Sequence, residues 1–179
     1  MSAIHPTAII EEGAVIGEGV SIGPFCHIGA QSVIGDGARL ISHVVIMGPT
    51  TLGSASLVYP NAVLGGEPQN TKHKGGHTTL VIGSNCVIRE GVTMHRGTDG
   101  SRGMTTIGDN CMFLAYAHVA HDCIIGDNVT FSNNVMIGGH VSIGNNVIIG
   151  GGAGIHQFVR VGHHAFIGGL AALASDLVP

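Results

Sequence analysis

Residues 125–149 read I-G-D-N-V-T-F-S-N-N-V-M-I-G-G-H-V-S-I-G-N-N-V-I-I, and an apolar residue recurs in them at every sixth position. The recurring residues are Ile125, Phe131, Ile137, Ile143 and Ile149. Neither a helical period of 3.6 nor a strand alternation of 2 produces this series, whereas a fixed short period is typical of a β-helix built from hexapeptides. We therefore predict an all-β chain that winds as a solenoid.

The same period extends on both sides of this stretch. It begins at Ile4, is interrupted after Leu64, resumes at Ile82 and runs without a slip from Ile107 to Leu173. The position four residues after a repeat aliphatic is small or slender, as at Ala8, Ala14, Val20, Cys26, Ser32, Ala38, Cys86, Val92, Cys111, Ala117, Cys123 and Val129. One long and one small inward residue per hexapeptide would fill a narrow prism. We expect residues 1–179 to form a single domain of stacked coils.

Composition restricts the class of protein. The 30 glycines suit sharp corners better than helices. The four cysteines share the small inward position, which favours reduced core residues over disulfides or metal ligands. A net charge of −4 argues against a nucleic-acid surface. Residues 1–7 lack the features of a signal peptide, and no apolar run approaches the roughly 18 residues of a membrane span. We expect a cytoplasmic protein without stable membrane insertion.

Two segments interrupt the repeat, at residues 65–79 and 97–103. The first is polar and rich in glycine, and long excursions from a regular scaffold are more often functional than decorative. Basic residues outnumber acidic residues between positions 68 and 105. The basic residues there are Lys72, Lys74, Arg89, Arg96 and Arg102, and the acidic residues are Glu90 and Asp99. This excess would suit an acidic partner or an anionic ligand.

The stretch A-H-V-A-H-D-C, residues 117–123, contains the strongest candidates for chemistry. If three hexapeptides complete one coil, residues 18 apart stack, which places His121, Gly139 and Gln157 in one column with His140 beside them. A neutral imidazole is a natural general base for a hydroxyl that attacks an acyl group. Asp122 or a backbone carbonyl would fix the tautomer of His121, and backbone N–H groups near Gly139 would receive the oxyanion. Since no serine or cysteine nucleophile is placed there, direct transfer is favoured.

These residues carry a resemblance to a known family. Residues 117–123, together with M-H-R-G-T at 94–98, N-N at 133–134, G-H at 139–140 and I-H-Q-F at 155–158, resemble the acyl-[acyl-carrier-protein]–UDP-N-acetylglucosamine O-acyltransferases. The resemblance implies a left-handed parallel β-helix that assembles as a homotrimer with active sites between subunits. It also implies transfer of an (R)-3-hydroxyacyl chain from acyl carrier protein to the 3-hydroxyl of the sugar nucleotide, the first step of lipid A biosynthesis, with no metal and no cofactor.

The resemblance also implies roles for individual residues. His121 matches the general base, with Asp122 beside it, and Gly139 matches a backbone donor to the thioester carbonyl. The positions that match substrate-binding residues are Gln69, Asn70, Lys72, His95, His118, His140, His156 and Gln157. Gly169 matches the position that limits acyl-chain length, and Phe166 lies close to it in the sequence.

Two departures from the family pattern leave alternatives open. The family has aspartate at the position of Asn70, so a 3-amino sugar nucleotide remains an alternative acceptor. The family also continues beyond the position of Pro179 into a C-terminal helical region with further nucleotide-binding residues, which we expect this chain to lack. A non-catalytic scaffold is therefore a second alternative.

Two other enzyme classes use the same scaffold. One is a hexapeptide acetyltransferase that takes acetyl-CoA. The other is a zinc hydratase of the γ-carbonic-anhydrase type, for which His118, His121 and His95 of a neighbouring subunit would have to converge on one ion.

Overall fold

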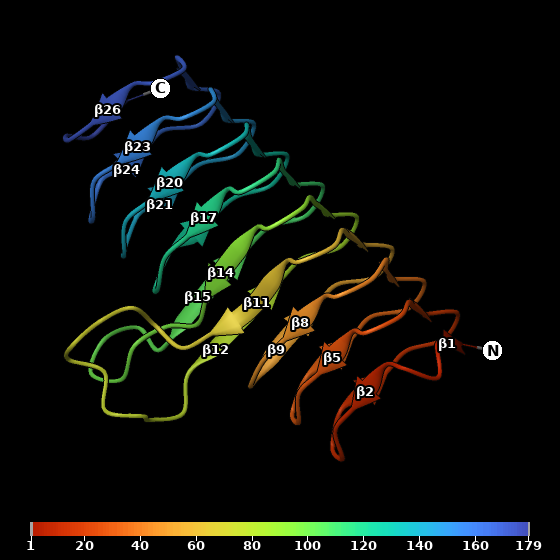
Figure 1. The fold of residues 1–179 in the computed structure, drawn as a ribbon. Coiled ribbons are helices and arrows are strands. Elements are labelled where there is room, and N and C mark those ends of the chain that lie inside the picture. Colours follow the sequence, from red (N-terminus) through yellow and green to blue (C-terminus); the bar gives the residue numbers. More distant parts are fainter. Residues whose placement is uncertain (1, 179) are drawn as a thin grey trace.

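The computed structural model describes residues 2–178, which wind into a left-handed parallel β-helix of very short strands (Figure 1). None of these residues forms a helix. Each hexapeptide contributes one strand and one corner, and three hexapeptides complete a coil. The six-residue period of the sequence thus predicts the architecture, because every strand places its repeat aliphatic on the inner side.

Strands of successive coils stack into three parallel sheets. The first sheet contains β1 (Ala3–Ile4), β4 (Ser21–Ile22), β7 (Arg39–Leu40), β10 (Leu57–Val58), β13 (Val87–Ile88), β16 (Met112–Phe113), β19 (Thr130–Phe131), β22 (Ile148–Ile149) and β25 (Phe166–Ile167). The second sheet contains β2 (Ile9–Ile10), β5 (His27–Ile28), β8 (Val45–Ile46), β11 (Val63–Gly66), β14 (Thr93–His95), β17 (His118–Val119), β20 (Met136–Ile137), β23 (Gly154–Ile155) and β26 (Ala172–Leu173). The third sheet contains β3 (Val15–Ile16), β6 (Val33–Ile34), β9 (Thr50–Leu52), β12 (Thr79–Ile82), β15 (Met104–Ile107), β18 (Ile124–Ile125), β21 (Ser142–Ile143) and β24 (Arg160–Val161).

The pairing register is the 18 residues that the repeat predicts. His118 pairs with Met136, which shows this spacing beside the candidate site. Where a loop lies between two paired strands, the separation in sequence between the paired residues exceeds 18. Leu57 pairs with Val87 across the first loop, and Met94 pairs with Val119 across the second.

The core is a continuous column of mostly aliphatic side chains inside the prism, and it contains two phenylalanine rings in edge-to-face contact. Phe113 and Phe131 lie 4.9 Å apart between ring centroids and are fully buried. All four cysteines are buried free thiols, as their repeat position predicts. Burial raises the pKa of the Cys123 thiol to about 12, which keeps it protonated.

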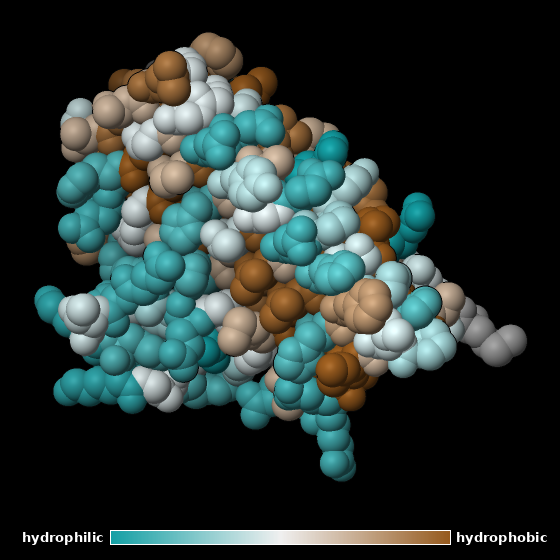
Figure 2. Space-filling view, in the orientation of Figure 1, coloured by the Kyte–Doolittle hydropathy of each residue, from teal (hydrophilic) through white to brown (hydrophobic). Residues whose placement is uncertain are grey.

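Both interruptions leave the second sheet and return to the third at the same side of the prism (Figure 1). Strand pairing continues through Gly66 and begins again at Thr79, so the first loop spans residues 67–78. The second loop lies between His95 and Met104. In Figure 2 the surface of these loops is hydrophilic, whereas apolar patches lie at the centre of the face and toward the C-terminal coils. No helix among residues 2–178 is long and apolar enough to cross a membrane.

Candidate active site

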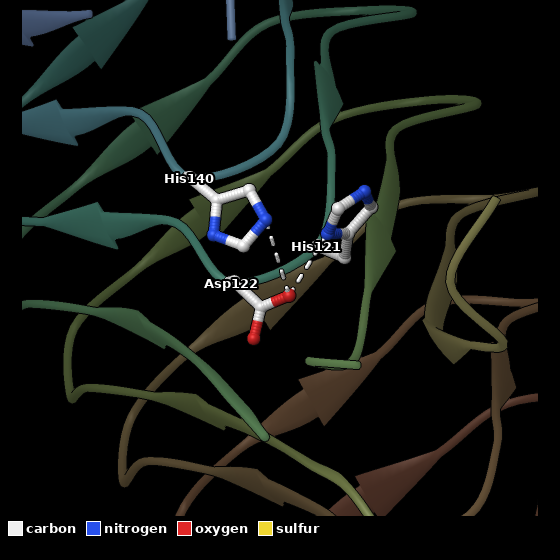
Figure 3. A group of neighbouring side chains, drawn as sticks. All are labelled: His121, Asp122 and His140. Atoms are coloured by element: carbon white, nitrogen blue, oxygen red, sulfur yellow. Dashed lines mark hydrogen bonds and ion pairs between the residues drawn. The ribbon is translucent and has the colours of Figure 1, made fainter. Parts of the chain in front are cut away.

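His121 lies at the corner that follows β17, and its side chain borders two clefts on the outside of the prism. Its side chain is 11% exposed. It is therefore more buried than expected from the stacking of residues 18 apart, which predicts an open strip of surface. Nδ1 lies 2.9 Å from Oδ2 of Asp122 (Figure 3). Because an ionised carboxylate only accepts hydrogen bonds, Nδ1 carries the proton and the lone pair of Nε2 is free.

Asp122 reaches His121 because the pair occupies a corner rather than a strand. Neighbouring side chains on a strand point to opposite faces, but Asp122 has a left-handed backbone with φ of 60°. Its own N–H donates to Oγ1 of Thr105 at 2.8 Å, which holds this conformation. Of the two candidates for fixing the tautomer of His121, the carboxylate of Asp122 is the one in contact.

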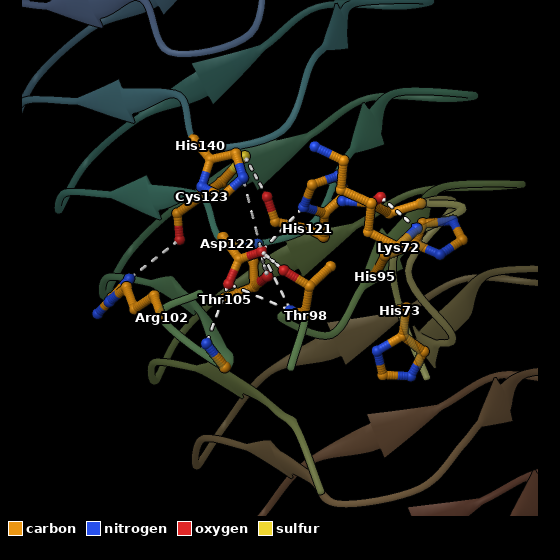
Figure 4. A network of polar contacts seen from close by, with 12 residues as sticks. Lys72, His73, His95, Thr98, Arg102, Thr105, His121, Asp122, Cys123 and His140 are labelled. Carbon is orange, nitrogen blue, oxygen red and sulfur yellow. Dashed lines mark hydrogen bonds and ion pairs between the residues drawn. The ribbon is translucent and has the colours of Figure 1, made fainter. Parts of the chain in front are cut away.

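The carboxylate of Asp122 is buried and fully hydrogen-bonded (Figure 4). It accepts the hydroxyl of Thr98 at 2.7 Å, the backbone N–H of Thr98 at 3.1 and 3.2 Å, and the N–H of Gly103 at 3.1 Å. Burial alone would raise the pKa of this carboxyl, but the hydrogen bonds from Thr98 and His121 outweigh burial and lower the pKa. Asp122 is therefore an anion that stabilises a positive charge on His121.

His140 completes this group from the next coil. Its Nε2 lies 3.9 Å from Oδ2 of Asp122, and its ring stacks on Phe158 with 4.4 Å between centroids. Burial lowers the pKa of His140 more than the charge of Asp122 raises it. The ligand atoms of His121, Asp122 and His140 converge as they would around a metal ion. The oxygens of Asp122, however, already accept the hydrogen bonds of the second loop, so the arrangement fits proton transfer better than coordination.

A second pair of histidines lies on the two neighbouring strands β17 and β14. His118 Nδ1 is 2.8 Å from Oγ1 of Thr93, and the rings of His118 and His95 lie 5.3 Å apart in an edge-to-face arrangement. His95 in turn contacts the carbonyl oxygen of Glu67 through Nδ1. Burial, with a smaller effect from His95, lowers the pKa of His118 to about 4, so it is neutral at physiological pH. Within a single chain, among residues 2–178, His95, His118 and His121 do not converge as metal ligands, so a zinc site there would need His95 of a neighbouring subunit.

Two clefts meet at His121. The first, called here the apolar groove, has a volume of about 680 Å³ and is lined by Gln69, His95, His118, Ala120, His121, Met136, Ile137, Gly138, Gly139, Gly154, Ile155, His156, Gln157, Ala172, Leu173 and Ala174. The second, called here the loop cleft, has a volume of about 920 Å³ and is lined by Asn70, Thr71, Lys72, Lys74, Thr98, Asp99, Gly100, Ser101, His121, His140, Gln157 and Phe158. The general-base candidate thus faces an apolar space and a cationic space at once.

Gly139 forms the floor beside His121. A Cβ atom at this position would lie 2.5 Å from Cε1 and 2.7 Å from Nε2 of His121, so any side chain would displace the ring. Within residues 2–178 the N–H of Gly139 donates to no other group of the chain. A free N–H beside a free imidazole nitrogen is the pairing that acyl transfer requires.

The structure brings most of the sequence-predicted residues to these clefts, but not all. Phe166 and Gly169 line neither cleft. Phe166 projects from the first sheet with 70% of its surface exposed. Their predicted role would need a second subunit to bring the first sheet against the apolar groove.

Sequence reasoning missed the residues that hold the histidines. Thr93, Thr98 and Thr105 come from β14, the second loop and β15, and none stands in a spacing of 18 from the residue it contacts. The lengthened register of 25 across the second loop pairs Thr93 with His118, and this register could have revealed that contact from the sequence. The contact of Thr98 with Asp122 depends on how the second loop folds, and no pattern in the sequence indicates it.

Comparison with known proteins gives consistent results. A family profile described as bacterial transferase hexapeptide (six repeats) matches residues 104–139. An acyl-[acyl-carrier-protein]–UDP-N-acetylglucosamine O-acyltransferase of Bartonella henselae is 69% identical over 176 residues, which is 98% of this chain and 64% of that protein. The chain therefore spans slightly less than two thirds of the length of this curated relative.

Solved structures of the same kind superpose closely. The chain matches LpxA from Acinetobacter baumannii with a TM-score of 0.96 at 45% identity, covering 97% of this chain and 67% of that one. It matches a UDP-N-acetylglucosamine acyltransferase from Campylobacter jejuni with a TM-score of 0.95 at 41% identity, covering 98% and 69% respectively.

Proposed function

Since the chain belongs to the UDP-N-acetylglucosamine O-acyltransferase family, we propose that it transfers an (R)-3-hydroxyacyl chain from acyl carrier protein to the 3-hydroxyl of UDP-N-acetylglucosamine. This reaction is the first step of lipid A biosynthesis, and its carrier-bound donor suits a cytoplasmic enzyme. The observation that carries the proposal is the pair formed by Nδ1 of His121 and the anionic Asp122, with Nε2 left free beside the backbone of Gly139.

In the proposed reaction, Nε2 of His121 takes the proton of the sugar hydroxyl while that oxygen attacks the thioester carbonyl carbon. The carbonyl oxygen becomes an oxyanion and accepts the N–H of Gly139. Asp122 stabilises the imidazolium that forms. When the C–S bond breaks, the imidazolium returns the proton to the departing thiolate, which leaves an ester and the free thiol of the carrier.

The apolar groove is the proposed site of the acyl chain. The outward residues of β20, β23 and β26 are Met136, Gly154 and Ala172, which follow His118 along the outer face of the second sheet. A Cβ atom at Gly154 would meet no other atom within 4 Å, so the groove is open at this position. A chain whose carbonyl sits at Gly139 would lie along this face and bury its methylenes, each stabilising by about 0.8 kcal/mol.

The loop cleft is the proposed site of the sugar nucleotide. Lys72 and Lys74 border it and supply positive charge for the diphosphate. The side chain of Asn70 turns toward its own loop, where Oδ1 accepts the N–H of Lys72 at 2.9 Å. An aspartate would make the same turn, but Asn70 adds no negative charge beside the acceptor. This neutral amide is the reason to keep a 3-amino sugar as the second candidate acceptor.

We also infer a homotrimer, with acyl carrier protein as a transient partner. A column of side chains runs along the outer face of the first sheet, where Met112, Ile148 and Phe166 are 40%, 48% and 70% exposed and the polar Thr130 lies between Met112 and Ile148. A second subunit packed against this column would cover it and would bring Phe166 and Gly169 toward a groove.

Mass spectrometry of the product tests the proposal. UDP-N-acetylglucosamine and its 3-amino analogue are offered separately with (R)-3-hydroxyacyl carrier protein, and acetyl-CoA is offered as the competing donor. We expect the O-acylated sugar nucleotide. Product from the amino analogue alone would identify an N-acyltransferase, product from acetyl-CoA alone an acetyltransferase, and no product with any pair a non-catalytic scaffold.

A further inference from the structure

The second loop contacts the pair formed by His121 and Asp122 (Figure 4). It also contacts the first loop, because Asp99 accepts the N–H of Lys74. Two adjacent residues make these contacts in different directions. Thr98 is directed at Asp122, and Asp99 is directed at the loop that carries Lys72. Neither residue has a role in the mechanism above, although both border the loop cleft.

Thr98 is buried with 3% exposure, and its hydroxyl and its backbone N–H both donate to Asp122. Its hydroxyl donates to Oδ2 at 2.7 Å, and Oδ2 is also the oxygen that accepts Nδ1 of His121 at 2.9 Å. The backbone N–H of Thr98 and that of Gly103 reach the same carboxylate. The hydroxyl is thus one of the donors that orient the carboxylate, and the carboxylate in turn orients the ring of His121.

Asp99 makes a comparable set of contacts with the first loop. Its carboxylate accepts the N–H of Lys74 at 3.0 and 3.1 Å and the N–H of Gly76 at 3.2 Å, and it lies 2.7 Å from Nδ1 of His73. Hydrogen bonds from Lys74, followed by those from Gly76 and His73, lower the pKa of Asp99, so it is ionised at neutral pH. Three contacts on one carboxylate fix the segment that follows Lys72.

We propose that Thr98 and Asp99 are positioning residues, Thr98 for the His121–Asp122 pair and Asp99 for the loop that binds the acceptor. The inference rests on the proposed acyl transfer. The second loop then couples the orientation of the base to the placement of the acceptor through two neighbouring side chains. Neither residue touches the reacting atoms, so each acts only through the group that it holds.

The two roles predict effects on different kinetic parameters, kcat for Thr98 and the acceptor KM for Asp99. A variant at one position is therefore the control for a variant at the other. Thr98→Val keeps the shape and the backbone N–H but removes the hydroxyl. Because a misplaced catalytic group costs up to about 100-fold, we expect kcat to fall about 10- to 100-fold while KM for the sugar nucleotide changes by less than about twofold. Asp99→Ala releases the first loop, and we expect the acceptor KM to rise about tenfold with kcat nearly unchanged.

Two further measurements exclude a merely structural effect of Thr98. Thr98→Ser retains the hydroxyl and is expected to recover most of kcat, whereas Thr98→Ala is expected to lose as much as Thr98→Val. In an Asp122→Asn background, Thr98→Val is expected to cost less than about twofold more, because the group through which it acts is already lost. Thermal unfolding followed by circular dichroism checks that the variants stay folded.

The role of Thr98 is overturned if Thr98→Val keeps its kcat, if Thr98→Ser is as slow as Thr98→Val, or if the loss is equally large without the carboxylate of Asp122. The role of Asp99 is overturned if Asp99→Ala leaves the acceptor KM unchanged or lowers kcat as Thr98→Val does. The unsubstituted chain is assayed in parallel. Absence of its turnover would refute the proposed acyl transfer, whereas normal turnover in it and in both variants would refute only the positioning roles.

Discussion

Asp122 adopts a left-handed backbone, which non-glycine residues adopt uncommonly, and the reactivity proposed for His121 depends on it. The conformation turns the carboxylate back toward Nδ1 of the preceding residue. The same left-handed conformation occurs at the corresponding corners of the adjoining hexapeptides, at Tyr116, Asn128 and Asn134, so the corner of the fold imposes it. At Asp122 the corner is held further by Thr105, which accepts its N–H, and by the second loop, which donates to its carboxylate.

Gly139 provides the first prediction at the residue scale. Gly139→Ala would place a methyl group 2.5 Å from Cε1 of His121, and the ring would have to move. The backbone at 139 does not have a positive φ, so alanine fits the corner itself. We expect kcat to fall at least about 100-fold while the circular dichroism spectrum stays unchanged. Near-normal turnover in this variant would mean that His121 does not need its present position.

His118 provides the second prediction at the residue scale. Its pKa is lowered to about 4 in the folded protein, so between about pH 6.5 and 4 the unfolded chain binds a proton that the folded chain does not. The free energy of unfolding therefore falls as pH drops through this window, by about 1 to 2 kcal/mol from His118 after allowing for the solvent that reaches the ring.

His118→Gln is expected to make urea unfolding less dependent on pH between 6.5 and 4. Some dependence remains, because the pKa of His140 is also lowered. An identical pH dependence in the variant and the unsubstituted protein would contradict the neutral state of His118.

At the scale of elements, side chains at one corner link each coil to the next. The N–H of Ser84 donates to Asp109, that of Asp109 to Asp127, and that of Asp127 to Asn145, at 2.7, 2.8 and 3.0 Å. These contacts satisfy backbone donors that the two-residue strands leave unpaired. The ladder stabilises the coils that carry the site.

Asp127 tests this ladder. Asp127→Ala leaves the N–H of Asp109 without its partner and is expected to lower the free energy of unfolding by about 1 to 2 kcal/mol. Asp127→Asn is the matched control, because Asn145 fills the same role one coil further with its amide oxygen. Equal stability of the alanine and asparagine variants in urea unfolding would show that the ladder contributes nothing.

The elements also show how far the sequence predicts the structure. The repeat predicts the strands, the inward residues and the register, because one hexapeptide satisfies the same packing demand in every coil. It places Gly139 beside His121 for the same reason. It does not predict the contact of His121 with Asp122, since that depends on a corner conformation. Nor does it predict the contacts of Thr98 and Asp99, which depend on how two non-repeating loops fold against each other.

At the scale of the whole molecule, the outer face of the first sheet predicts self-association. Contiguous apolar surface on a protein generally marks an interface. Ile148 and Phe166 are neighbours on this face, and Met112 follows beyond Thr130. We expect sedimentation equilibrium to give three times the chain mass of 18.2 kDa. Ile148→Lys, which places a charge in the column, is expected to shift the protein toward the monomer. A monomer at micromolar concentration without any substitution would contradict the proposed assembly.

The most direct test of the central claim is the rate of acyl transfer by His121→Ala, measured with (R)-3-hydroxyacyl carrier protein and UDP-N-acetylglucosamine. A general base contributes about 10²- to 10⁴-fold, so we predict a loss of that size in kcat. The variant should retain the sedimentation behaviour and thermal stability of the parent. Transfer at the parental rate by a folded His121→Ala protein would contradict the assignment of the base and the mechanism built on it.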